Sequence, residues 1–441
     1  MMYDALGNAL SGANAAGVAH YETAVRQFQC YIQDPVASID QALAAAPDMV
    51  MAHVLKAYLH LLGTEPEATA VARDCHRAAT RLAKNPRERG HVRAIGELCY
   101  GRWRAAGITL EDVAIDDPRD VLALQAGHLI DFYTGSSRML RDRIARALPA
   151  WSPGMPHHHA VLGMHAFGLE EGADYARAER QGRLAVEAEP RDGWAWHAVA
   201  HVMEMQGRHA DGTAWLADNA EIWSHESFFA VHLWWHLALY HPERGEIDRV
   251  LALYDGPIYG TRSPVVLDMI DASAMLWRLH LRGVDLGERW QAIADGWEPL
   301  AAAGNYAFND VHAAMAFIGA GRTAALDRLL TAQAMALEAQ NDNAGFTRDV
   351  GQPMTRAIIA FAEGDYDEVV RLLRRVRPIA NRFGGSHAQR DLIDLTLIEA
   401  ACRSGQAALA RALTAERIAL KPASPLARMY AMRTDGMAEA A

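Results

Sequence analysis

Prolines recur along the first half of the chain at intervals of 32 to 39 residues. Each proline follows one Ala- or Leu-containing run and precedes another, and an interval of this length is typical of a helix hairpin in a repeat protein. The prolines are Pro47, Pro86, Pro118, Pro153 and Pro190. The same register continues, at intervals of roughly 40 residues in most units, through Ser224, Pro264, Gly304, Gly345 and Gly385. The pattern predicts about ten helix hairpins.

Glycines mark the middle of many of these units, where a glycine would end the first helix of a pair. They are Gly63, Gly135, Gly207, Gly245 and Gly364. The second helix of a pair should bury an apolar stripe against its neighbours. For residues 365–376 the expected buried face consists of Val369, Val370, Leu372, Leu373 and Val376.

Length and composition favour a repeat array over a single globular core. The chain has 441 residues, which exceeds what one hydrophobic core usually supports. Hydrophobic residues make up 51% of it, and β-branched and aromatic runs that would indicate strands are scarce. We therefore predict an all-α fold, a tetratricopeptide-like α-solenoid that winds as a right-handed superhelix. It should form a single continuous domain over residues 1–441.

Several classes of protein are disfavoured by charge and cysteine content. The formal net charge of -11 opposes binding to nucleic acid or to an anionic membrane. The apolar stretch at residues 50–62 is interrupted by His53, Lys56 and His60, and no basic residue precedes Arg26, so neither a membrane span nor a secretory signal is expected. Four widely spaced cysteines suggest no disulfide framework. A soluble, cytoplasmic protein fits these features.

Two of the expected helices carry histidines one turn apart. In the first, residues 194–205 include His197, His201 and Glu204, and spacings of four and three residues place the three side chains on one helix face. In the next unit, His232 and His236 repeat the four-residue spacing. Because imidazole binds metals and exchanges protons near neutral pH, these helices predict a metal site or a proton relay.

Polar side chains continue in the same register through the later units. A buried charge is costly unless it is paired, so these residues either satisfy one another or face a wet pocket. Asp310 and His312 are predicted to act with the histidines and Glu204 as acid/base groups. The predicted ligand-binding residues are Asp268, Asp271, Asn309, Arg348, Asp349, Gln389, Arg390, Asp391 and Trp235.

Each of these positions also has a structural interpretation. Paired histidines can form a satisfied hydrogen-bond network between helices. Asp268 and Asp271 can cap a helix and interact with its dipole. Trp235 can be core packing. The Arg–Asp neighbours at 348–349 and 390–391 can be structural ion pairs. Spacing alone does not decide between these interpretations and the functional ones.

Signatures of common enzyme classes are missing from the sequence. It has no Gly-x-Ser-x-Gly elbow, no phosphate-binding Gly-Lys loop, no dinucleotide-binding Gly-x-Gly-x-x-Gly and no His-Glu-x-x-His. No nucleotide cofactor is expected, whereas a divalent metal stays open. The run at 157–159 is interpreted as a surface or helix-capping feature, and Cys99 is not expected to be a nucleophile.

Stretches of sequence around the polar positions resemble the tetratricopeptide repeat protein 38 family over most of the chain. The matching words are 196–205 (WHAVAHVMEM), 234–236 (WWH), 308–312 (FNDVH) and 384–391 (GGSHAQRD), together with 141–142, 287–291 and 348–351. The resemblance implies a tetratricopeptide-like superhelix. It implies no reaction, because the family is named for its fold, but the words are centred on the polar positions proposed above.

Two classes of function fit these observations. In the first, the inner histidines and carboxylates bind and transform a small polar molecule by hydrolysis or elimination, with or without a divalent metal. In the alternative, the concave groove is a scaffold for a peptide or partner protein. A carboxylate-binding groove would be expected to show Lys, Arg and Asn rather than clustered histidines, so we favour the first class. The sequence leaves homodimer formation open.

Overall fold

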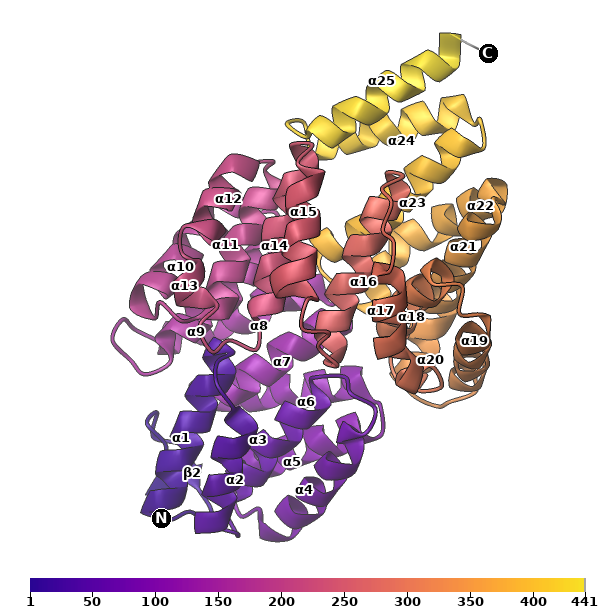
Figure 1. Ribbon diagram of the computed structural model, residues 1–441. Helices are drawn as coiled ribbons and strands as arrows, with labels where there is room; N and C mark the ends of the chain where they lie inside the picture. Colours follow the sequence, from indigo (N-terminus) through magenta and orange to yellow (C-terminus); the bar gives the residue numbers. More distant parts are fainter. Residues whose placement is uncertain (440–441) are drawn as a thin grey trace. The chain divides into compact units, whose positions relative to one another are not determined.

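The computed structural model describes residues 1–439, and nearly all of its named elements are helices (Figure 1). The two strands, β1 (Met2–Tyr3) and β2 (Ala9–Leu10), form a short antiparallel ribbon near the N-terminus. The predicted all-α class is therefore confirmed. Among the described residues, no helix is both long and apolar enough to cross a membrane.

Packing divides the chain into two compact units. The first unit comprises Met1–Val199 and Asn219–Leu233, and the second comprises Ala200–Asp218 and Trp234–Ala441. The division falls within two helices, after Val199 in α11 (Gly193–Met205) and after Leu233 in α14 (Ala230–Glu243). The single continuous domain stays a prediction.

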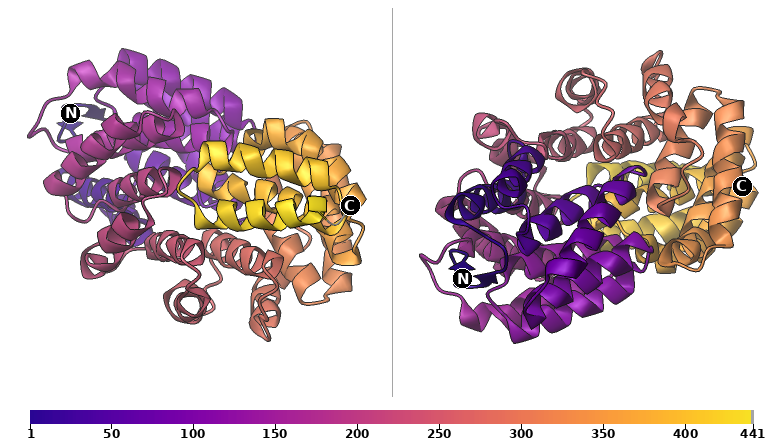
Figure 2. Two further views of the ribbon diagram at one scale, coloured as in Figure 1. Left: turned by 90° about the horizontal axis from the view of Figure 1, so that it is seen from above. Right: turned by 90° about the horizontal axis from the view of Figure 1, so that it is seen from below.

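The first unit is a stack of helix hairpins. Helix α3 packs on α4, α5 on α6, α7 on α8 and α9 on α10, and the predicted prolines lie between or at the start of these pairs. Figure 2 shows the pairs as successive neighbours. The helices are α1 (Ala15–Cys30), α2 (Pro35–Ala45), α3 (Val50–Leu61), α4 (Ala68–Leu82), α5 (Pro86–Cys99), α6 (Trp103–Asp116), α7 (Val121–Tyr133), α8 (Ser137–Ala147), η1 (Leu148–Ala150), α9 (His158–Glu171), α10 (Tyr175–Ala188) and α13 (Ala220–Trp223).

Local sequence explains where these helices begin. Pro86 occupies the first turn of α5, where its missing N–H costs nothing, and the side chain of Asn85 accepts the backbone N–H of Glu88 at 2.9 Å. Asp120 caps α7 in the same way by accepting from the N–H of Ala123 at 2.9 Å. Side-chain caps at Asn85 and Asp120 therefore help to start the hairpins formed by α5 and α7.

The second unit repeats the hairpin arrangement, with α21 on α22 and α24 on α25. Its helices are α12 (His209–Ala217), α15 (Ile247–Leu253), η2 (Tyr254–Ile258), α16 (Val266–Leu281), α17 (Arg289–Trp297), η3 (Glu298–Leu300), α18 (Ala307–Gly319), α19 (Thr323–Leu337), α20 (Asp342–Phe346), η4 (Thr347–Gly351), α21 (Gln352–Glu363), α22 (Tyr366–Val376), η5 (Arg377–Phe383), α23 (His387–Arg403), α24 (Ala407–Leu420) and α25 (Pro425–Glu439). In the left view of Figure 2, α24 and α25 lie side by side.

Helix α22 tests the predicted burial pattern directly. All five residues expected on its buried face are buried, and Gly364 ends the preceding helix with a φ of 80°. The first helices of successive pairs, α16, α18 and α21, pack against one another in sequence. The hairpins thus form a tetratricopeptide-like helical-repeat fold, as predicted, while the handedness of the superhelix stays a prediction.

Candidate functional site

Helices α11 and α14 carry the predicted histidines at matching positions. Helix α11 begins after Asp192, whose Oδ1 accepts the backbone N–H of Ala195 at 3.0 Å. From that start, His197 and His201 follow one turn apart on the same face. His232 on α14 lies opposite His197, and His236 lies opposite His201.

The first pair, His197 and His232, lies within the first unit. Their Nε2 atoms are 3.1 Å apart, and the ring centroids are 4.9 Å apart. His197 is buried with 2% of its surface exposed, and its ring is 5.2 Å from that of Phe167 and 5.3 Å from that of Phe229. His232 is half-buried. The two facing nitrogens thus lie in a largely aromatic environment.

The second pair, His201 and His236, lies within the second unit. Both residues have 0% exposed surface, and their ring centroids are 4.4 Å apart at an interplanar angle of 60°. The ring of Trp235 packs edge-on against His236 at 5.0 Å. Both imidazoles are therefore enclosed by protein.

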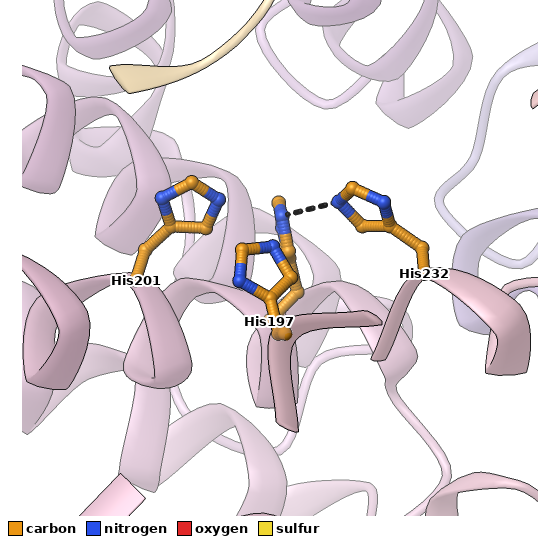
Figure 3. Close-up of side chains that lie close together, drawn as sticks. His197, His201 and His232 are labelled. Atoms are coloured by element: carbon orange, nitrogen blue, oxygen red, sulfur yellow. Dashed lines mark hydrogen bonds between the residues drawn. The ribbon is translucent and has the colours of Figure 1, made fainter. Parts of the chain in front are cut away.

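The four imidazoles are a group that could hold a metal ion. Each offers a nitrogen atom, and these nitrogens all lie within 4.8 Å of one another. Figure 3 shows His197, His201 and His232 close together. We call this group the four-histidine cluster (His197, His201, His232 and His236). It is a donor set of imidazoles without a carboxylate, which suits zinc, copper, nickel and iron.

Glu204, one turn beyond His201, lies at a cavity of about 40 Å³ in the second unit. A volume of this size holds roughly three water molecules. The cavity is rich in charge, and we call it the charged cavity. Its titratable lining residues are Glu204, His209, Glu243, Arg278, Arg282, Asp391, Arg417, Lys421 and Tyr430.

Ion pairs organise the charged cavity. Lys421 Nζ is 2.6 Å from Glu204 Oε1, and Arg417 Nη1 is 2.6 Å from Asp391 Oδ1. Arg278 lies 3.5 Å from the other oxygen of Asp391, and its guanidinium is 5.9 Å from the centre of a Trp235 ring. Burial alone would raise the pKa of Asp391, but Arg417 and Lys421 more than offset burial and hold that pKa well below its usual range.

Three polar atoms at this cavity are unsatisfied. Arg278 Nε, Arg417 Nε and Glu204 Oε2 are buried and have no hydrogen-bond partner in the part of the chain that the structure describes. Buried polar atoms of this kind are usually satisfied by water or by a ligand. The charged cavity can therefore take a small molecule that has both donors and acceptors.

The predicted acid/base residues of α18 lie in the core of the second unit. Burial raises the pKa of Asp310 to about 7. Burial lowers the pKa of His312 to about 4, and its Nδ1–H donates to the Phe308 carbonyl oxygen at 2.7 Å. Asn309 is also buried. At neutral pH His312 is thus uncharged and Asp310 is near its titration midpoint.

Three further predicted ligand-binding residues lie near the starts of α16 and α23. Asp268, in the first turn of α16, accepts from Ser263 Oγ at 2.6 Å, and Asp271 is buried on the same helix. Gln389 completes a reciprocal capping box with Ser386 at the start of α23. Gln389 therefore caps a helix, and Asp268 contacts a neighbouring side chain, while the ligand-binding roles of these residues stay predictions.

In both predicted Arg–Asp neighbours, the aspartate forms an ion pair with an arginine from elsewhere in the chain. Asp349 pairs with Arg382 at 2.8 Å, while Arg348 is exposed. Arg390 donates to the Gly385 carbonyl oxygen, and Asp391 pairs with Arg417. Structural ion pairs are present here, but their partners come from other helices.

Sequence reasoning missed the basic side of the charged cavity and a cluster in the first unit. Arg278, Arg417 and Lys421 carry no spacing signal, because their partners lie on distant helices. In the first unit, the structure groups Cys30 with His159 and Glu189. The three consecutive histidines at 157–159 were interpreted as a surface or helix-capping feature because they precede a helix. No spacing in the sequence indicated that one of them lies near Cys30.

Comparison with known proteins adds little to this description. No model of a known protein family matches the chain. Among solved structures, the chain is similar to one in the crystal structure of the APC/C hetero-tetramer Cut9–Hcn1, with 12% sequence identity and a TM-score of 0.38. The alignment covers 86% of this chain and 76% of that chain. A likeness at this level carries no argument about function.

Proposed function

We propose that the four-histidine cluster binds a divalent transition-metal ion, and that the protein uses this ion to hydrolyse or eliminate a group from a small polar molecule. The spacing of the facing nitrogens carries the proposal. Two ligand atoms bound to one tetrahedral zinc ion at about 2.0–2.1 Å lie roughly 3.3 Å apart. The Nε2 atoms of His197 and His232 are 3.1 Å apart.

The environment of the cluster also supports a metal ion. His197, His201 and His236 are buried, so an ion held by them would be shielded from most of the solvent. Aromatic rings surround the first pair, which lowers the local dielectric constant and strengthens the interaction between ion and imidazole. A hydrogen-bond network between the paired imidazoles explains the contacts between their rings without a metal ion. A measurement of bound metal distinguishes this interpretation from the metal site.

The difference in burial among the histidines suggests a division of roles. Catalytic zinc sites use three protein ligands and leave a fourth position for water. The three buried histidines supply three ligands, and half-buried His232 is then the displaceable fourth ligand. A water bound to zinc in such a site has a pKa of about 7, so hydroxide is available at neutral pH.

The charged cavity is the proposed anchor for the substrate. Glu204, which lines the cavity, lies three residues after His201 on α11. Arg278, another lining residue, lies over the ring of Trp235, the neighbour of His236. The unsatisfied Nε atoms of Arg278 and Arg417 are suited to a carboxylate or phosphate on the substrate. Because Glu204 is paired with Lys421, it orients groups in the cavity rather than serving as a free base.

The sequence resemblance supplies a family for this proposal. We place the chain in the tetratricopeptide repeat protein 38 family on the basis of the matching words, several of which contain residues of the cluster and of α18. The proposal does not depend on this placement, because it rests on the distances within the cluster.

Elemental analysis of protein purified without added metal or chelator tests the proposal. We expect stoichiometric zinc or another transition metal, and we expect the His201→Ala, His236→Ala double variant to hold one equivalent less than the wild-type protein while staying folded by circular dichroism. The matched control is His312→Ala, which removes a buried histidine outside the cluster. If neither the wild-type protein nor protein refolded with zinc retains metal at the cluster, the histidines are structural and the scaffold alternative stands.

A further inference from the structure

Four helix ends meet around Cys30 in the first unit. Helix α1 ends at Cys30, α9 carries His159 in its first turn, Glu189 caps the C-terminus of α10, and Asp192 precedes α11. The Cys30 sulfur, a His159 ring nitrogen and a Glu189 carboxylate oxygen lie within 4.8 Å of one another. We call these three residues the Cys30 group. It shares no residue with the four-histidine cluster.

Asp192 fixes the orientation of His159. Its Oδ2 is 2.7 Å from His159 Nδ1, while its Oδ1 accepts the N–H of Ala195 in the first turn of α11. Because an ionised carboxylate only accepts hydrogen bonds, Nδ1 is the donor in this contact, and Nε2 is the ring nitrogen left for a metal ion. A carboxylate behind the imidazole is the usual second-shell partner of a metal-binding histidine. Asp192 itself is fully buried, so it holds this geometry firmly.

We propose that the Cys30 group is a second metal site, selective for a soft divalent cation of the zinc class. Sulfur, nitrogen and oxygen donors in one group match zinc ligation, and three protein ligands leave a fourth position for water. One thiolate and one carboxylate balance the charge of a divalent ion. The site contrasts with the four-histidine cluster, which offers only nitrogen.

Burial and existing contacts allow an ion to enter. Cys30 has no exposed surface, but the side chains of His159 and Glu189 are 12% and 17% exposed and form the open side of the group. Glu189 is paired with Arg26 at 2.7 Å, and the Arg26 side chain is 46% exposed. The guanidinium can therefore move into water when the carboxylate turns to an ion, because exposed ion pairs are weak.

A Cys–His–Asp catalytic triad is the competing interpretation of these residues. Nucleophilic catalysis requires a thiolate that substrate can reach. Cys30 is fully buried, so an organic substrate cannot reach its sulfur. The geometry of the site therefore favours a metal ion, which is small enough to reach the sulfur, over an organic substrate.

Cobalt titration of the metal-free, full-length protein tests the second site. A Co²⁺ ion bound to a thiolate gives a near-ultraviolet charge-transfer band, whereas imidazole ligands give only the weaker visible bands. We expect a near-ultraviolet band that saturates by two equivalents of added Co²⁺, one for each proposed site, and is displaced by Zn²⁺. Cys30→Ser should abolish it. The matched control is Cys75→Ser, which changes another buried cysteine on α4 and should keep the band.

Two further variants separate this site from the proposed function. His159→Ala should weaken Co²⁺ binding at the thiolate site at least tenfold, and it provides the test if Cys30→Ser does not fold. The His201→Ala, His236→Ala double variant should keep the near-ultraviolet band while losing the visible bands of the four-histidine cluster. Absence of the band in wild-type protein at saturating Co²⁺, or its persistence in Cys30→Ser, overturns the second site.

Discussion

Replacing Asp310 with asparagine should stabilise the protein above neutral pH and leave its stability nearly unchanged in acid. Burial raises the pKa of Asp310 from 3.8 to about 7. In the unfolded chain the carboxyl group releases its proton near pH 4, whereas in the folded protein it keeps the proton up to about pH 7. The folded state thus binds more protons between these values, and the free energy of unfolding falls as pH rises through this window.

The size of the expected change in stability follows from the shift in the pKa of Asp310. About three pKa units at roughly 1.4 kcal/mol each give a cost of about 4 kcal/mol once Asp310 is ionised in the folded state. Asparagine has a similar shape and no charge, so Asp310→Asn avoids this cost. We expect the variant to be more stable than the wild-type protein by up to about 4 kcal/mol at pH 8 and by close to zero at pH 4.

Urea unfolding followed by circular dichroism at both pH values measures this difference. Asp327→Asn, at an exposed position on α19, is the control and should change the free energy of unfolding by less than about 0.5 kcal/mol at either pH. If Asp310→Asn is less stable than the wild-type protein at pH 8, or if its effect is the same at both pH values, then Asp310 is ionised and paired in the folded state and the reasoning is wrong.

Three other substitutions follow from the contacts. Asp391→Ala should destabilise the protein by about 3–5 kcal/mol because it leaves buried Arg417 without its partner. Asp349→Ala removes a pair with half-exposed Arg382 and should cost less than about 1 kcal/mol. Thermal melts should therefore show a much lower melting temperature for Asp391→Ala than for Asp349→Ala. Gln389→Ala should cost about 1 kcal/mol by removing one half of a capping box, with no loss of metal at the four-histidine cluster. Equal melting temperatures for the two aspartate variants, or metal loss in the glutamine variant, would contradict these assignments.

The hairpin fold could be predicted because its signals are local. Proline at a helix start, glycine after a helix and an apolar stripe act within one or two turns, and α22 shows the expected buried face residue by residue. The pairing of His197 with His232 was also accessible, because both residues occupy the same position in neighbouring units. The repeat period therefore predicts which residues occupy equivalent positions in the first helices of neighbouring hairpins.

Contacts between distant helices could not be predicted in this way. Glu204 was predicted as an acid/base group, but its partner Lys421 is 217 residues away and belongs to no repeated word. Asp391 was predicted beside Arg390, yet the ion pair forms with Arg417 on α24. The partner of a buried charge depends on how hairpins stack, and a single sequence carries no direct signal for that.

Anomalous diffraction at the zinc absorption edge, from crystals of the full-length protein grown with zinc, tests the central claim most directly. The account predicts a peak among His197, His201, His232 and His236, at about 2.0–2.1 Å from nitrogen atoms of at least three of them. Crystals of the His201→Ala, His236→Ala variant, grown with zinc in the same way, should lack this peak. A wild-type map with zinc elsewhere on the protein but none within the four-histidine cluster would contradict the proposed function.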